Sequence, residues 1–323
     1  MSLLFRLAAL ALLGPSLATA AAALLKLDHR WPDILVQFTA PMLIATAGLT
    51  FIYALVRLWT PAAAGLAATG LLTLAVWPQW FPNGPTPPQN ADTLRLYSAN
   101  LWVRNTDSDR IAASVAEADP DIVVLIELNR EVSADLDRIL VNHPYRVASM
   151  FLDPASGVAR SMVASRWPLT ALPDPRDGLH SVAVIAETPQ GPIRVVGVHM
   201  TRPWPFQYQW GQLIQVQALT QLISGSPEPV IVAGDFNAVS TSRAGRMLQA
   251  DTGLHPAPGW PGTWPAKAPS VPAALGMTID QVYLSNDLAV RSRRLGLATG
   301  SDHRPVVTDI VLSDGEQSTN VRP

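Results

Sequence analysis

The chain has 323 residues, and its charge is almost balanced, with 23 Lys and Arg against 25 Asp and Glu. This balance argues against a protein that holds nucleic acid through a broad basic surface. The chain contains no cysteine, which excludes disulfide frameworks, thiolate nucleophiles and cysteine-ligated zinc or iron–sulfur sites.

The N-terminal part of the chain contains long apolar stretches that lack charged residues. They are Leu7–Leu25, Ile34–Val56 and Ala62–Trp80. Each has about the 20 residues that a helix needs to cross the hydrocarbon core of a membrane. The second includes Gln37 and Pro41, which a membrane helix tolerates when neighbouring groups satisfy the freed backbone. Residues 1–82 therefore predict a membrane region of about three transmembrane helices rather than buried core helices.

The first apolar stretch has a second interpretation. Arg6, the apolar run and the small residues 18–20 are also typical of a secretory signal peptide. With or without cleavage, the number of crossings places the C-terminal part of the chain outside the cytoplasm. Arg57 agrees with this orientation under the positive-inside rule, whereas Lys26 and Arg30 oppose it. We therefore predict an integral protein of the plasma or inner membrane with an extracytoplasmic C-terminal part.

A change of pattern separates this region from the rest of the chain. Residues 83–92 are rich in proline and predict a linker, because proline and glycine disfavour a helix or a central strand. Residues 93–313 alternate between β-rich and helical runs, and residues 314–323 form a polar tail. The predicted strands are Leu94–Leu101, Asp121–Ile126, Arg194–Val198, Val230–Ala233, Ile279–Leu284 and Val306–Val311, and the predicted helices are Asp107–Ala118 and Phe206–Ile223. This mixture lacks a strict β-α-β period and predicts a layered α/β fold rather than a barrel.

Polar residues interrupt the apolar pattern at the ends of these strands. They lie at or just beyond the C-terminal end of a predicted strand, or in the loop before one: Asn100, Glu127, His199, Asp235, Asn237, Asp280, Asp302 and His303. In open α/β sheets, side chains at such positions converge on a ligand. A carboxylate that follows an apolar strand, as Glu127 does, is costly to desolvate unless it is paired or bound to a metal. The pattern indicates one shared site.

Six motifs in chain order resemble those of a known superfamily. They are Ser98-Ala99-Asn100, Asp121–Glu127, Gly197-Val198-His199, Gly234-Asp235-Phe236-Asn237, Thr278-Ile279-Asp280 and Ser301–Val306. Over roughly residues 94–310 they resemble the endonuclease/exonuclease/phosphatase superfamily, which includes pancreatic-type deoxyribonuclease, apurinic endonucleases, neutral sphingomyelinases and inositol polyphosphate 5-phosphatases. The chain looks like a membrane-anchored, bacterial-type member. The resemblance implies an α/β fold, a four-layer α/β/β/α sandwich of two mixed sheets, preceded here by N-terminal transmembrane helices.

The resemblance also implies a metal-dependent phosphoester hydrolase, with a phosphodiester as substrate and water attacking the phosphorus in line. Glu127 would bind the divalent metal, and Asn100 would lie close to it. Asp302 would contribute to the metal site or orient His303. Oxygen ligands and the lack of cysteine favour Mg²⁺ or Mn²⁺ over zinc.

The remaining motif residues would act on the water and the phosphate. The resemblance implies that Asp235 orients or deprotonates the attacking water, and that Asn237 donates its amide to a phosphate oxygen. His303 would contact the phosphate as a donor or general acid/base, held by Asp280. His199 would be a second phosphate contact or acid. On their own, Asp235 and Asn237 also have a simpler interpretation, because Gly-Asp-x-Asn favours turns.

Several functions stay open at this point. A nuclease-like phosphodiesterase acting on nucleic acid is the first, and a phospholipid or sphingolipid head-group phosphodiesterase is the alternative, which would explain membrane lipid contact through the N-terminal helices. A non-catalytic binding module is disfavoured, because no motif position carries an inert residue. Arg202, followed by the stretch Trp204–Trp210, is a candidate for substrate binding, although core and helix-start roles also explain these residues. No protein partner is predicted.

Other titratable residues have structural interpretations. Glu131, close in sequence to Glu127, is interpreted as the exposed start of a helix. We interpret the other histidines as structural or surface residues: His29, His143, His180 and His255.

Overall fold

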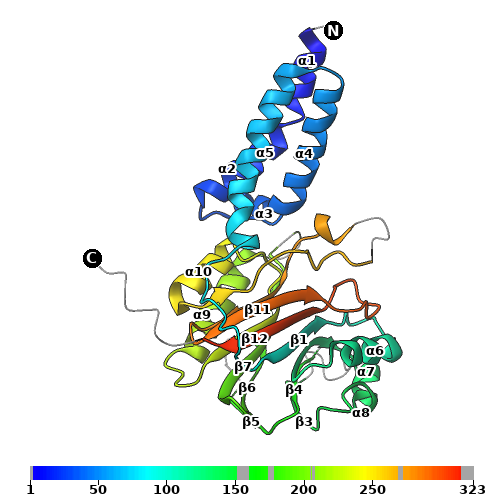
Figure 1. Ribbon diagram of the computed structural model, residues 1–323, viewed down its shortest axis with the longest axis vertical. Coiled ribbons are helices and arrows are strands. Elements are labelled where there is room, and N and C mark those ends of the chain that lie inside the picture. Colours follow the sequence, from blue (N-terminus) through cyan, green and yellow to red (C-terminus); the bar gives the residue numbers. More distant parts are fainter. Residues whose placement is uncertain are drawn as a thin grey trace, which may run out of the picture.

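The structure of the chain, a computed structural model, describes residues 3–150, 160–173, 178–203, 205, 208–267 and 272–313. An N-terminal bundle of helices stands on a larger α/β body (Figure 1). The predicted polar tail, and Trp204, Phe206 and Gln207 of the predicted tryptophan-rich stretch, lie outside the described residues.

The N-terminal bundle contains five helices in the described part of the chain. They are α1 (Leu3–Ala11), α2 (Gly14–Leu25), α3 (Arg30–Val36), α4 (Thr39–Leu55) and α5 (Trp59–Trp80). Leu3–Leu25 and Trp59–Trp80 are each long and apolar enough to cross a membrane. Together, α3 and α4 form a third candidate span that is bent by 61°.

The bend between α3 and α4 differs from the single apolar stretch expected at Ile34–Val56. The two helices part at Gln37, whose side-chain oxygen accepts a hydrogen bond from the Val239 N–H at 2.8 Å. Asp33, one turn earlier, accepts one from the Arg243 N–H at 2.6 Å. The polar face of α3 thus packs on the α/β body. As a result, the axis of α3 points in a different direction from the axis of α4.

Helices α1 and α2 pack against α4 and α5 within the N-terminal bundle. The Tyr53 hydroxyl on α4 donates to the Ala9 carbonyl on α1 at 2.8 Å, and the hydroxyls of Ser16 and Thr46 lie 2.7 Å apart. Leu13 is buried between α4 and α5. Such internal hydrogen bonds satisfy polar groups in an apolar surrounding, where an unpaired group would be costly.

Two mixed sheets form the body. The first, in the order β11-β12-β1-β2-β4-β3, consists of β1 (Leu94–Asn100), β2 (Ile122–Leu128), β3 (Tyr145–Ala148), β4 (Arg160–Ser165), β11 (Leu288–Leu295) and β12 (Val306–Leu312). The second, in the order β5-β6-β7-β8-β10-β9, consists of β5 (Leu169–Ala171), β6 (His180–Thr188), β7 (Gly191–His199), β8 (Val230–Asp235), β9 (His255–Pro256) and β10 (Asp280–Leu284). Within each sheet one neighbouring pair is parallel: β1 with β2, and β7 with β8.

Helices cover the outer face of each sheet. They are α6 (Ser108–Ala118), α7 (Arg130–Ala134), α8 (Leu136–Ile139), α9 (Gln209–Ile223) and α10 (Arg243–Thr252). A short 3-10 helix, η1 (Ala273–Leu275), lies against α4 of the bundle instead. Figure 1 shows α6 to α8 on one side of the body and α9 and α10 on the other. Ile111 of α6 packs on the first sheet, and Leu219 of α9 packs on the second.

The main core lies between the two sheets. Val124 and Ile126 of the first sheet pack against Val195 and Ile231 of the second, and all four are fully buried. Burying a side chain of this size stabilises the fold by about 1.5–3 kcal/mol. The layers are therefore helix, sheet, sheet and helix, which confirms the predicted α/β/β/α sandwich of two mixed sheets.

Candidate active site

The topology brings the predicted site residues to one edge of the sandwich. In each parallel pair the polar residues close the strands: Asn100 ends β1, and His199 and Asp235 lie opposite each other at the ends of β7 and β8. Because β10 runs antiparallel to β8, its first residue, Asp280, pairs with Asp235. His303 lies in the loop before β12, which is antiparallel to β1.

Asn100 connects the two sheets inside the site. Its amide Nδ2 donates to Glu127 Oε1 and to Asp235 Oδ2, at 2.9 Å in both cases. Its Oδ1 accepts from the Trp102 N–H at 2.9 Å. The side chain therefore presents a donor, not an oxygen, to both carboxylates, and ligation of a metal by Asn100 would require the amide to turn over.

An irregular backbone directs the Glu127 carboxylate into the site. The register between β2 and β4 shifts between Leu125 and Leu128, and Glu127 has a φ of +59°. A bulge of this kind re-aims a side chain that the regular alternation would direct elsewhere. Such a φ is uncommon for a residue other than glycine and is characteristic of functional positions. The second oxygen, Oε2, accepts from the Val103 N–H at 3.0 Å.

The charge of Glu127 is set by opposing effects. Burial acts to raise the pKa of Glu127, but the charge of His199 and the hydrogen bond from Asn100 outweigh it, so the pKa lies below its usual range. His199 Nε2 lies 3.4 Å from Glu127 Oε1 and 3.8 Å from Asp235 Oδ2. The carboxylate is thus ionised at neutral pH and faces an imidazole across the site.

His303 is held as a cation between two carboxylates. Its Nδ1 donates to Asp280, at 2.9 Å from Oδ2 and 3.1 Å from Oδ1, and its Nε2 lies 3.9 Å from Asp235 Oδ2. Burial acts to lower the pKa of His303, but the negative charges of Asp280 and Asp235 outweigh it and raise the pKa to about 10. Ser301 Oγ orients the loop by accepting from the His303 N–H at 3.0 Å and donating to the Asn100 carbonyl at 2.8 Å.

Asp235 occupies the centre of the site. The Asn237 N–H donates to its Oδ1 at 2.7 Å, while its Oδ2 faces Asn100 and both imidazoles. Burial raises the pKa of Asp235 above its usual range, although the nearby charge of His303 acts in the opposite direction. A carboxylate with a raised pKa is a better proton acceptor than an ordinary one.

Two groups of side chains in the described part of the chain are close enough to hold one metal ion each. They are Glu127 with His199 and Asp235, and Asp235 with Asp280 and His303, and the donor atoms of each group lie within 4.8 Å of one another. The structure therefore brings these predicted site residues together. Glu131 lies exposed at the start of α7, as predicted.

Asn237, Asp302 and Arg202 lie around this centre. Asn237 has a φ of +48°, and its Nδ2 donates to the Met200 carbonyl at 2.9 Å and to Asp235 at 3.3 Å. Asp302 is outside both groups; its Oδ1 is buried and lacks a hydrogen-bond partner among the described residues. Arg202 is exposed and lines a pocket that also includes Asn237.

Some supporting residues had no signal in the sequence. Thr263 Oγ1 accepts from the Asp280 N–H at 3.2 Å and so fixes the start of β10. Gln37, from the N-terminal bundle, lines the same pocket as Arg202 and Asn237. Gln37 stands out in the sequence only as a polar residue within an apolar stretch, and the tertiary contacts alone place both residues at the site.

The sequence profile of the Endonuclease/Exonuclease/phosphatase family matches residues 97–303, which is most of the α/β body. The chain belongs to this family. No curated protein matches it in a sequence comparison. As a member of the endonuclease/exonuclease/phosphatase family, it is a hydrolase that acts on phosphoesters.

Solved structures share the fold of this family member. An endonuclease/exonuclease/phosphatase from Beutenbergia cavernae has a TM-score of 0.55 and 20% identity, over 68% of this chain and 72% of that one. A family protein from Bacteroides thetaiotaomicron has a TM-score of 0.56 and 16% identity, over 69% and 99%. A mannosyl-6-phosphatase of the same organism has a TM-score of 0.54 and 17% identity, over 68% and 100%. At these identities the likeness concerns the fold alone.

Proposed function

We propose that the chain is a membrane-anchored phosphodiesterase that uses a divalent metal. The observation that carries this proposal is the convergence of Glu127, Asp235 and His303, from both sheets, on a single site. Two groups of side chains overlap at Asp235, and within each group the donor atoms lie within 4.8 Å of one another. This spacing suits a cation and a phosphate bound side by side.

The donor set fits Mg²⁺ or Mn²⁺. Glu127 offers carboxylate oxygens, the ligands that these ions prefer, at one side of the two groups that could hold an ion. The buried, unpartnered Oδ1 of Asp302 is a further oxygen near His303. When bound, the ion would neutralise charge that develops on the phosphate oxygens.

Asp235 and His303 carry out the two proton transfers of the reaction. Asp235 accepts the proton of the attacking water as the water oxygen bonds to phosphorus and the bond to the leaving alcohol oxygen breaks. His303 donates its Nε2 proton to that oxygen, and Asp280 holds the imidazole through Nδ1. The products are a phosphomonoester and an alcohol. The proton on Asp235 returns to His303, 3.9 Å away, and restores both groups.

Asn237 and His199 bind the non-bridging phosphate oxygens in this scheme. The Asn237 amide would exchange its 3.3 Å hydrogen bond to Asp235 for one to a phosphate oxygen, and the His199 imidazole faces the same space. Donors positioned before the reaction stabilise the charge that forms in the transition state. Asn100 holds Glu127 and Asp235 at a set separation.

The division of the chain and its location belong to the same proposal. Residues 1–82 anchor the protein in the plasma or inner membrane, residues 83–92 connect, and residues 93–313 form the catalytic domain outside the cytoplasm. The two apolar helices and the bent pair, each long enough to span a bilayer, support the anchor.

The test uses the full chain in detergent with bis-(p-nitrophenyl) phosphate. Glu127→Gln, Asp235→Asn and His303→Gln are each expected to lower kcat/KM by about 100-fold or more, since each removes a group that acts on the reaction. Chelation with EDTA should abolish activity, and Mg²⁺ or Mn²⁺ should restore it. Circular dichroism checks that the fold is intact. Near-normal activity in a triple variant would refute the proposal.

A further inference from the structure

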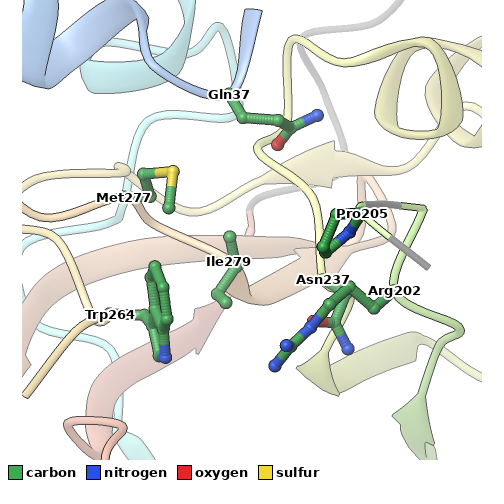
Figure 2. A pocket seen from close by; sticks show the side chains of 7 residues that line it. All are labelled: Gln37, Arg202, Pro205, Asn237, Trp264, Met277 and Ile279. Carbon is green, nitrogen blue, oxygen red and sulfur yellow. The ribbon is translucent and has the colours of Figure 1, made fainter. Parts of the chain in front are cut away.

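A pocket of about 220 Å³ opens beside the catalytic residues, beneath the N-terminal bundle. It is lined by Gln37, Arg202, Pro205, Asn237, Trp264, Met277 and Ile279. Figure 2 shows Asn237 and Arg202 at one end of the pocket, with Met277 and Trp264 on the opposite wall and Gln37 above. The pocket therefore connects the phosphate-binding side of the site with the helices that reach into the membrane.

The roof of the pocket is the part of the N-terminal bundle that is hydrogen-bonded to the catalytic body. Gln37 is 2% exposed and lies where α3 ends and α4 begins, in the bent candidate span. Its hydrogen bond from Val239, and that of Asp33 from Arg243, hold this bend against the catalytic body. A ligand in the pocket would thus touch the end of a membrane helix and Asn237 at the same time.

The lining has two chemically different ends. Met277 and Ile279 are buried side chains that offer only an apolar surface, and Pro205 adds to it. Arg202 is the one cation among the described lining residues, and it lies next to the amide of Asn237. The Trp264 indole ring stands on the same side of the pocket as Met277 and adds an aromatic face to this wall.

From this arrangement we infer that the pocket binds the acyl-glycerol part of a membrane phospholipid whose phosphodiester lies at Asn237. This inference rests on the proposed phosphodiesterase activity and names its substrate class. Arg202 pairs with the phosphate, and the first carbons of the lipid contact Met277 and Ile279. The remaining acyl chain extends from the pocket into the bilayer beside α4.

A nucleic acid strand fits this lining poorly. Strand binding relies on several cations along the backbone and on aromatic faces for successive bases. Among the residues that the structure describes, the lining offers one cation, Arg202, and one aromatic ring, Trp264. Gln37, the remaining side-chain amide apart from Asn237, is already engaged with Val239. The observations therefore favour a lipid.

The reaction on such a lipid has a definite outcome. Water attacks phosphorus, the bond between phosphorus and the glycerol oxygen of the lipid breaks, and that oxygen takes the proton from His303. The products are a diacylglycerol, which stays in the membrane, and a phosphorylated head group, which leaves in water.

The experiment compares two substrates on the full chain in detergent. They are dioleoyl phosphatidylglycerol in mixed micelles and glycerophosphoglycerol, the same phosphodiester without acyl chains. We expect the wild-type chain to prefer the lipid in kcat/KM by roughly tenfold or more, because the pocket binds the part that glycerophosphoglycerol lacks.

Two variants at one position test the pocket itself. Met277→Trp fills the apolar wall and should reduce the preference for the lipid to near one, mainly through KM, whereas Met277→Leu keeps the volume and should keep the preference. Native mass spectrometry in detergent provides a second reading: the wild-type chain should retain phosphatidylglycerol, and the Met277→Trp chain should lose it.

The outcomes separate this inference from the proposed function. Preferred cleavage of glycerophosphoglycerol or of a single-stranded oligonucleotide, or an equal loss on both glycerol substrates in Met277→Trp, would overturn the lipid pocket and leave the phosphodiesterase standing. If bis-(p-nitrophenyl) phosphate and all of these substrates stay intact, both proposals fall.

Discussion

At the residue scale, Asp280 decides the charge of the imidazole that faces the substrate. Both of its oxygens lie within 3.1 Å of His303 Nδ1, and both residues are almost fully buried. In this setting the imidazolium is stabilised by a carboxylate that water cannot screen. The pair therefore keeps His303 ready to donate a proton at neutral pH.

Asp280→Asn should lower kcat on bis-(p-nitrophenyl) phosphate by about 10²- to 10⁴-fold, because His303 loses its orienting and charge-stabilising partner. The pKa of His303, raised to about 10, should fall once burial is no longer opposed by Asp280. The alkaline limb of the pH–rate profile, where His303 loses its proton, should therefore move to lower pH. An unchanged alkaline limb would contradict this assignment.

The control for this prediction is Asp309→Asn. Asp309 pairs with Arg95 at 2.7 Å on β12 and β1, away from the site and partly exposed. Because surface ion pairs contribute only about 0–1 kcal/mol, this change should leave both kcat and the pH profile close to those of the wild-type chain.

A glycine next to the central carboxylate is also required by geometry. Gly234 has a φ of +141°, and a Cβ there would overlap the backbone oxygen of Val198 on the neighbouring strand. Gly234→Ala should therefore destabilise the fold by about 2 kcal/mol or more, and thermal unfolding in detergent measures this loss.

Gly211→Ala is the matched control for Gly234→Ala. Gly211 lies in α9, where a Cβ would meet Thr201 at an ordinary 3.6 Å. Alanine favours a helix over glycine by about 1 kcal/mol, so this variant should be as stable as the wild-type chain or more stable. Equal losses of stability in the two variants would refute the steric argument.

At the element scale, α3 is the contact that orients the N-terminal bundle on the catalytic body. Asp33 is 2% exposed and accepts from the Gln209 side chain at 2.5 Å as well as from the Arg243 N–H at 2.6 Å. These bonds join α3 to the starts of α9 and α10. The Gly259 N–H also donates to the Gln79 carbonyl near the end of α5, at 2.8 Å.

Asp33→Ala should weaken this junction by about 1–3 kcal/mol, since it leaves two buried donors without an acceptor. The expected fall in Tm of the full chain in detergent is several degrees. Asp28→Ala is the control, because Asp28 is largely exposed and pairs with Arg246 at 3.4 Å. The two variants should differ clearly in Tm; equal Tm values would show that the junction does not depend on Asp33.

At the scale of the whole molecule, buried neutral histidines should make the fold sensitive to acid. His143 Nε2 donates to the Pro120 carbonyl at 2.9 Å, and His255 Nε2 donates to the Leu288 carbonyl at 3.0 Å. Burial lowers the pKa of both imidazoles despite these hydrogen bonds. Both residues are therefore structural, in agreement with the sequence interpretation.

The sign of the pH dependence follows from these shifts. The stability that the fold gains from burying neutral His143 and His255 is complete above the pKa of about 6.5 that a histidine has in the unfolded chain. It is lost as the pH falls through the lower pKa of the folded chain, because the unfolded chain then binds more protons. Denaturant midpoints measured between about pH 8 and pH 5 should fall with pH. A chain with both His143→Gln and His255→Gln should show a smaller fall, and an identical slope would contradict the prediction.

The strands and their polar ends could be predicted from local pattern. The strands that hold site residues begin and end within about three residues of their predicted bounds, because continuous apolar runs such as Asp121–Ile126 suit strands buried on both faces. The second apolar stretch was predicted less well. Apolar length identifies it as a membrane candidate, but the break at Gln37 depends on partners in residues 239–243.

The sequence by itself determined the layered α/β fold and which residues close its strands, because apolar runs and the polar residues after them are local features of the chain. Only the tertiary structure decided that Asn100 joins Glu127 to Asp235, which lies 135 positions after Asn100 in the sequence. It also decided that Gln37 covers the same site from the N-terminal bundle. These contacts cross from one sheet to the other or from bundle to body. Their geometry depends on how whole layers pack, and no short segment encodes it.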